Sequence, residues 1–155
     1  MTAVEDLALL RRTLVEAEAA HPGAEEAVGL LLATVERPSG YDATPEGLIP
    51  FAWTGGDGVH FSQAPGGGPV TMTVPMAFDG ENVIVGRDLR GFLSLGLRTG
   101  YFVLEQLAYD RAAMLVRLRT GDPLDEVAEA TLGRIAAAFG IAPPDDPAAL
   151  LDAAL

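Results

Sequence analysis

Residues 48–86 constrain the fold most strongly, because four short segments of alternating apolar and polar side chains are separated by glycine-rich turns. This spacing is typical of an antiparallel meander in which one face of the sheet packs on a core and the other faces water. The alternation is clearest in the third segment, where Val70, Met72 and Val74 oppose Thr71 and Thr73. The predicted strands are Leu48–Thr54, Val59–Gln63, Pro69–Met76 and Val83–Val85. In the first of them, Ile49, Phe51 and Trp53 are expected on one face.

Helical patterns occupy the chain on both sides of these strands. Thr2 and Glu5 have the spacing of a capping box, ahead of an apolar stripe made of Val4, Leu7, Ala8, Leu14 and Val15. Further helices are predicted over Ala24–Glu36, before a break at Arg37–Gly40, then from Asp88 to Leu97, over Tyr101–Arg119, from Asp122-Pro123 to Phe139 and after Asp146-Pro147.

The order of these elements predicts one α+β domain over residues 1–155. We expect helices in residues 3–36, a central and largely antiparallel sheet of about four or more strands in residues 48–86, and helices in residues 88–155 that pack on one face of the sheet. A chain of this length buries enough surface to fold without disulfides or metal ions.

The net charge of −12 comes from 22 acids and 10 bases, all of them arginine. A direct nucleic-acid ligand is disfavoured, because phosphate binding depends on a basic surface. The acidic surface could serve solubility, or it could steer a basic protein partner toward the chain. The absence of cysteine excludes disulfides, thiolate zinc sites and cysteine nucleophiles.

The same features predict a cytoplasmic protein without a membrane partner. The chain opens with acids where a secretory signal would carry positive charge. No apolar run approaches the length of about 18 residues that a membrane span requires.

The segment around Asp57 and His60 holds the richest candidate chemistry. These two side chains could form an acid–base pair or two ligands of a metal ion, which is the basis of an alternative hypothesis of a small hydrolase or metal-binding enzyme. A metal site generally needs three or four ligands, and the only other histidine is His21. Ser62 lies on the same strand face as His60, which is unlike the strained turn of a nucleophile elbow. We therefore interpret the segment as a glycine-rich hairpin and expect no catalytic residue, metal or cofactor.

The sheet offers a candidate binding surface instead. If Phe61 and Met72 face the helices, the alternation of side chains along each strand places polar residues on the opposite face. That polar face could dock a partner or be merely solvated. The candidate binding residues are Trp53, Asp57, His60, Ser62, Thr71 and Thr73.

Two groups of charged residues are weaker candidates. Arg87, Arg90 and Arg98 could form a small anion site, but surface ion pairs with Asp88 and neighbouring acids are the favoured interpretation. Glu105 with Asp110 could form a pair of carboxylates, although a helical pattern surrounds Glu105 and favours a solvated side chain.

The middle of the chain resembles proteins of the SUKH superfamily, which comprises relatives of the fungal cell-wall-assembly regulator and many bacterial immunity proteins. The block Leu48–Phe61 is similar to the central strand–turn–strand of that family. Asn82–Gly86 and the following Asp88–Leu93 are similar to its short strand and to its helix with a Phe-Leu pair. The C-terminal helices have no counterpart that we can place. The resemblance implies an α+β fold without catalytic apparatus and a role in binding proteins, such as the neutralisation of a toxin.

These observations lead to three hypotheses. The first is a non-catalytic protein-binding module of the immunity or regulatory type, with a basic toxin or effector as its partner. The second is the enzyme that uses Asp57 and His60. The third is a structural subunit that forms a homo-oligomer through the sheet face or the Tyr101–Arg119 helix.

Overall fold

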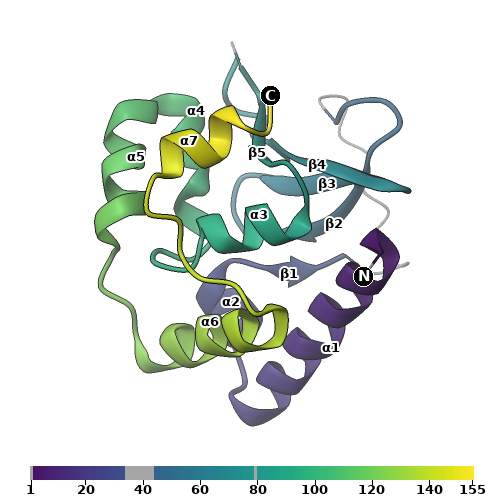
Figure 1. Cartoon of the computed structure of the whole chain (residues 1–155), viewed down its shortest axis with the longest axis vertical. Helices are drawn as coiled ribbons and strands as arrows, with labels where there is room; N and C mark the ends of the chain where they lie inside the picture. Colours follow the sequence, from purple (N-terminus) through teal and green to yellow (C-terminus); the bar gives the residue numbers. More distant parts are fainter. Residues whose placement is uncertain (1, 34–43, 79) are drawn as a thin grey trace.

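The alternating segments of residues 48–86 form an antiparallel sheet, as their period of two predicts. The computed structural model describes residues 2–33, 44–78 and 80–155. Strands that follow one another in sequence are neighbours in the sheet (Figure 1). The predicted meander is therefore confirmed, with one additional edge strand. The strands are β1 Leu31–Leu32, β2 Ile49–Trp53, β3 His60–Ala64, β4 Gly67–Thr73 and β5 Asn82–Gly86.

Helices precede and follow the sheet, which confirms the predicted α+β order. Local capping signals begin several of them: Thr2 and Glu5 form the predicted capping box, and Asp88 accepts a hydrogen bond from the backbone N–H of Gly91. None of the helices in the described part of the chain has the length and apolar character that a membrane crossing requires. The helices are α1 Ala3–Ala20, α2 Ala24–Val28, α3 Leu89–Leu95, the 3-10 helix η1 Phe102–Glu105, α4 Gln106–Tyr109, α5 Arg111–Thr120, α6 Glu126–Phe139 and α7 Pro147–Asp152.

The predicted helix Ala24–Glu36 is wrong over residues 29–33, because α2 ends at Val28. Gly29 ends α2 in the left-handed conformation, with φ 71°, and a Cβ atom there would lie 2.5 Å from the backbone nitrogen of Phe102. The chain then continues as β1, which pairs with the end of β2. The rest of the predicted helix and the predicted break at Arg37–Gly40 lie outside the described residues.

The predicted helix Tyr101–Arg119 is divided into η1, α4 and α5. Asp110 causes the interruption, because it leaves the helical conformation at φ −147° and its side chain accepts a hydrogen bond from the backbone N–H of Ala113. An aspartate placed three residues before a free N–H group thus begins a new helix in the middle of a continuous apolar pattern.

The predicted helix start at Asp122-Pro123 is also wrong, because α6 begins at Glu126 with Asp125 as its cap. Asp122 instead forms an ion pair with Arg117, at 2.6 Å between the carboxylate oxygen and the guanidinium nitrogen. The predicted end of the helix at Gly140 is confirmed, with this glycine at φ 62°.

The core lies between one face of the sheet and the helices, with α3 crossing that face (Figure 1). Phe92 of α3 is fully buried, and its ring centroid lies 4.6 Å from that of Phe61 on β3 and 5.1 Å from that of Tyr101. The close approach of α3 depends on Gly86, where a Cβ atom would lie 2.5 Å from the backbone nitrogen of Phe92. This packing leaves His60 on the opposite face of the sheet.

Candidate functional site

The predicted polar face of the sheet exists, because the strand register brings its members together. His60 pairs with Thr73, and Ser62 pairs with Thr71, across the β3–β4 ladder. These four side chains lie on the face opposite Phe61. The period-two assignment of the candidate binding residues on these two strands is therefore confirmed.

The exposure predicted for this face is wrong. His60, Ser62 and Thr73 are fully buried, and Thr71 is 8% exposed. These side chains form a polar interior layer, and they cannot serve as an open docking surface in this conformation. Their contact with a ligand stays a prediction.

Trp53 belongs to this polar face and not to the face of Phe51. Between Pro50 and Ala52 the β2–β3 register shifts by one residue, so that Phe51 has no partner on β3. Trp53 pairs with His60, and the two ring centroids lie 5.1 Å apart. The prediction that Phe51 and Trp53 share one face is therefore wrong, because a bulge reverses the alternation between them.

Both ring nitrogens of His60 are engaged. Nδ1 lies 2.8 Å from the carbonyl oxygen of Gly58, which can only accept, so Nδ1 carries the proton. In the neutral ring, Nε2 then accepts from the hydroxyl of Thr44, at 2.8 Å. Burial lowers the pKa of His60, and the bond to Gly58 opposes this effect. The neutral imidazole is thus held in one tautomer by its own hairpin.

We expect the buried imidazole of His60 to make stability depend on pH. Below the ordinary histidine pKa of about 6.5, the unfolded chain binds a proton that the folded chain still excludes. The contribution is therefore fully present above this pH and is lost as the pH falls toward the lowered pKa, with a slope of at most about 1.4 kcal/mol per pH unit. Urea unfolding of the wild type and of His60→Gln at pH values of about 7 and about 5.5 measures this effect.

The difference between wild type and His60→Gln is the appropriate readout, because carboxylates also titrate near the lower pH. The pKa of Glu105, for example, is raised by burial and by the negative charge of Asp57, and such a raised carboxyl pKa changes stability in the opposite sense. Equal loss of stability in both proteins would show that His60 does not contribute.

Ser62 carries an unsatisfied hydroxyl within the polar layer. Its buried hydroxyl oxygen forms no hydrogen bond with any residue that the structure describes. An unpaired buried hydroxyl typically costs about 1–3 kcal/mol. Since Nε2 of His60 is bonded to Thr44, it is not bonded to Ser62 in the manner of an activated nucleophile.

Asp57 lies apart from this layer. It occupies the β2–β3 turn with φ 49°, and its side chain is exposed. No ion pair joins Asp57 to His60, both of which are described. The negative charge of Asp57 instead helps to raise the pKa of Glu105, which the sequence suggested as a partner of Asp110. Within residues 2–33, 44–78 and 80–155, no three potential His, Asp or Glu ligands gather around a metal position.

The three arginines near the sheet–helix junction bind different partners and do not form one anion site. Arg87 lies 3.9 Å from Asp88 in an exposed ion pair. Arg90 pairs with Asp6 on α1, and Arg98 donates to the carbonyl of Pro144, at 2.7 Å. Two of the three therefore hold segments together that are distant in sequence.

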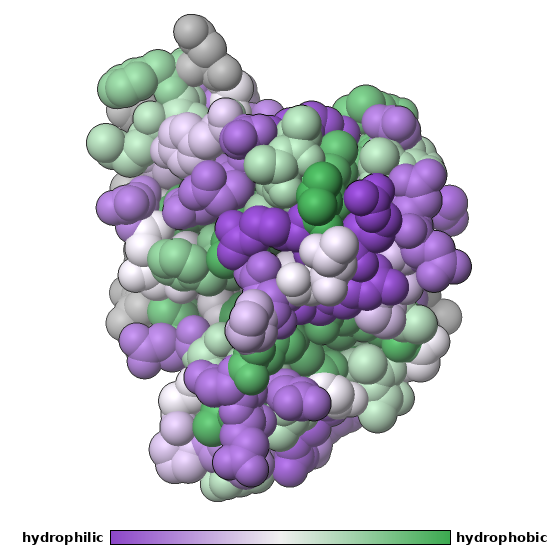
Figure 2. Space-filling view, turned by 90° about the vertical axis from the view of Figure 1, so that its left-hand side faces the viewer, coloured by the Kyte–Doolittle hydropathy of each residue, from purple (hydrophilic) through white to green (hydrophobic). Residues whose placement is uncertain are grey.

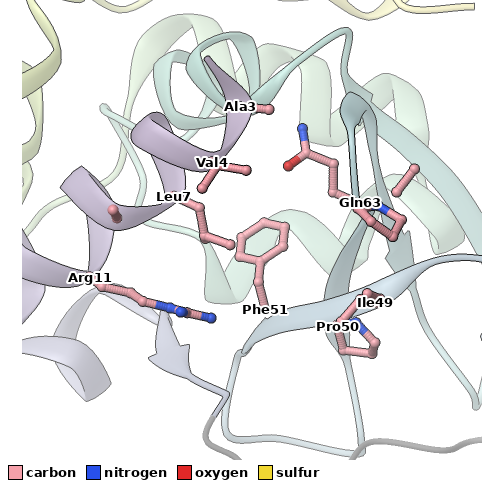
Figure 3. A pocket seen from close by; sticks show the side chains of 11 residues that line it. Ala3, Val4, Leu7, Arg11, Ile49, Pro50, Phe51 and Gln63 are labelled. Carbon is pink, nitrogen blue, oxygen red and sulfur yellow. The ribbon is translucent and has the colours of Figure 1, made fainter. Parts of the chain in front are cut away.

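A groove that sequence reasoning missed lies between α1 and the β2–β3 hairpin (Figure 3). It has a volume of about 520 Å³. Val4, predicted to face the core, is 69% exposed at its rim, and Ile49 is 57% exposed. Figure 3 shows Phe51 between the two walls, with Arg11 extending from α1 toward β2. The periodicity of α1 could not reveal this groove, because only the packed structure shows which side of the apolar stripe meets the core.

The connection between β4 and β5 carries a second missed feature. Phe78 is 87% exposed and Met76 is 58% exposed, although both side chains are apolar. Apolar residues gather at the upper left of the molecule in Figure 2, at the end where this connection projects. The sequence held a signal here, because the apolar run 74–78 continues from a strand directly into a turn, where polar residues are usual.

Comparisons of the chain with protein-family models, with curated proteins and with solved structures give no match.

Proposed function

We propose that this chain is a non-catalytic cytoplasmic module that binds a basic protein through the β4–β5 connection. The observation that carries the proposal is the exposure of Phe78, of which 87% is accessible, next to the exposed Met76. Aromatic residues and methionine are enriched at protein interfaces, where burial of the ring supplies binding energy. A projecting phenylalanine that contributes little to its own core is suited to fill a pocket of a partner.

The charge of the chain supports a basic partner. A net charge of −12 would speed the encounter with a positively charged protein and repel nucleic acid. The resemblance of Leu48–Phe61 to SUKH-superfamily proteins supports the same class of function and implies a protein toxin as the partner, and the acidic charge suits a basic one such as a nuclease.

The other two hypotheses receive less support. The enzyme hypothesis needs Asp57 and His60 to act together, and these side chains lie in different environments, one exposed and the other buried. The homo-oligomer hypothesis relied on the sheet face, whose polar residues are buried, or on a continuous Tyr101–Arg119 helix, which is interrupted at Asp110.

The proposal is tested by placing the photo-crosslinking residue benzoylphenylalanine at position 78 in the cells that make the protein. Val116 on α5, which is also exposed and apolar, is the matched control position. We expect a discrete adduct with one basic protein from position 78 and none from position 116. The purified partner should then bind the wild type more weakly as salt concentration rises.

Affinity measurements complete the test. Phe78→Asp should weaken binding of that partner at least about tenfold, which is the usual loss at a central interface residue, whereas Val116→Asp should leave it unchanged. Identical adducts from both positions, an adduct only with a second copy of the chain, or an unaltered affinity of Phe78→Asp would contradict the proposal.

A further inference from the structure

The groove between α1 and the β2–β3 hairpin combines an apolar lining with the cationic side chain of Arg11. Of the described residues in this lining, all except Arg11 and Gln63 are apolar: Ala3, Val4, Leu7, Ala8, Ile49, Pro50, Phe51, Ala64 and Pro65. Its volume of about 520 Å³ falls within the range of roughly 300–1,000 Å³ that is usual for sites of small ligands. The groove is therefore large enough and apolar enough to take up a chain of methylene groups.

Among the lining residues that the structure describes, Arg11 alone is charged. It forms no ion pair with any residue that the structure describes, whereas Arg87, Arg90, Arg111 and Arg117 each pair with an aspartate. Arg12, Arg98, Arg119 and Arg134 also form no ion pair within the described residues, so what distinguishes Arg11 is its place in an apolar groove. Its guanidinium can bind a carboxylate through two parallel hydrogen bonds.

The polar groups of the lining favour a lipid-like ligand over a peptide. Gln63 already donates from Nε2 to the carbonyl of Gly68, at 2.8 Å, and Pro50 and Pro65 have no backbone N–H to offer. A peptide segment would bring amide groups that need hydrogen-bond partners on burial. An alkyl chain brings none, and its single carboxylate would match the single guanidinium.

We propose that this groove binds a long-chain carboxylate, with the alkyl chain between α1 and β2 and the carboxylate on Arg11 (Figure 3). The site is distinct from the exposed apolar residues Met76 and Phe78, so it does not depend on the proposed function.

Isothermal titration with dodecanoate, at concentrations below micelle formation, tests this site. We expect saturable binding of one dodecanoate per chain. Arg11→Gln should weaken it about tenfold, the effect of losing one charge-assisted contact. Arg12→Gln is the matched control, because Arg12 neighbours Arg11 on α1 but lies outside this groove. This control should leave the affinity within about twofold of wild type, since exposed single charges at a distance are largely screened by salt.

Two further measurements locate the alkyl chain. Ile49→Asp, at an exposed position of the lining, should abolish binding because it places a carboxylate in the path of the ligand. Dodecanol, which has the same chain without the charge, should bind Arg11→Gln and wild type equally. The proposal is overturned if dodecanoate shows no saturable binding, if Arg12→Gln weakens binding as much as Arg11→Gln, if Ile49→Asp binds normally, or if only a peptide with an acidic end competes for the groove.

Discussion

Replacement of Phe92 by alanine is expected to lower the free energy of unfolding by about 3–5 kcal/mol, the usual cost of removing a buried ring from a packed core. Phe92 is fully buried on α3, and three aromatic rings surround it. Its ring centroid lies 6.0 Å from that of Phe51, 4.6 Å from that of Phe61 and 5.1 Å from that of Tyr101. The substitution would remove apolar contacts with two strands at once and leave a cavity between sheet and helix.

Urea unfolding followed by circular dichroism measures this loss, and Phe78→Ala is the matched control. The same chemical change at a side chain that is 87% exposed should alter stability by no more than about 0.5 kcal/mol. A loss below about 1 kcal/mol for Phe92→Ala would mean that the surrounding rings collapse into the space or that α3 does not pack as described.

The contrast between these two phenylalanines also bears on function. A ring whose removal leaves the fold unchanged is free to evolve for another purpose, such as filling a pocket of a partner. If Phe78→Ala proves as destabilising as Phe92→Ala, the ring of Phe78 packs in its own core. The proposed binding surface would then lose its main anchor, even though the rest of the fold stayed as described.

Local signals in the sequence predicted much of this fold, because they act within a few residues. Thr2, Asp88 and Asp146 cap the helices that their positions predicted, and Gly140 ends α6 in the left-handed conformation. The alternation of β4 likewise depends only on backbone geometry. These features needed no knowledge of distant contacts.

The errors arose where a distant contact decides the outcome. Gly29 ends α2 where the backbone of Phe102, far away in sequence, approaches too closely for a side chain. The bulge at Phe51 transfers Trp53 to the polar face, although the uninterrupted alternation placed both rings on one face. The bulge leaves no local pattern, so periodicity could not predict it, whereas Gly29 is a helix-ending glycine of the same kind as Gly140.

The sequence predicted only part of the candidate site, because local patterns do not show which segments pack against one another. The period of two correctly grouped His60 and Ser62, but it cannot say whether a face meets water or protein. The groove at Arg11 was missed because it joins α1 to β2, and their separation in sequence hides the contact. The exposed Phe78, in contrast, could have been found from an apolar run that enters a turn.

Replacement of Arg90 by methionine should cost about 2–4 kcal/mol, because it removes one partner of a largely buried ion pair. Arg90 on α3 donates from Nε and Nη2 to the two carboxylate oxygens of Asp6 on α1, each at 3.3 Å. Its Nη1 donates to the carbonyl of Phe139 at the end of α6, at 2.6 Å, and the guanidinium lies 5.3 Å from the centroid of that ring. One side chain thus links three helices.

The size of this loss of stability depends mainly on the carboxylate of Asp6 that remains after the substitution. The side chain of Asp6 is only 11% exposed, so Arg90→Met leaves a poorly hydrated carboxylate without its cation. The expected loss lies below that of a fully buried pair, because the side chain of Arg90 is itself 35% exposed.

If the unpaired charge of Asp6 is the main cost, the double variant Asp6→Asn/Arg90→Met should be more stable than Arg90→Met alone. Urea unfolding compares these proteins with Arg87→Met, which removes an exposed pair of 3.9 Å and should change stability by less than about 0.5 kcal/mol. A double variant that is less stable than Arg90→Met would show that Asp6 stabilises α1 independently of the guanidinium, and that the link between the helices depends on the Phe139 carbonyl instead.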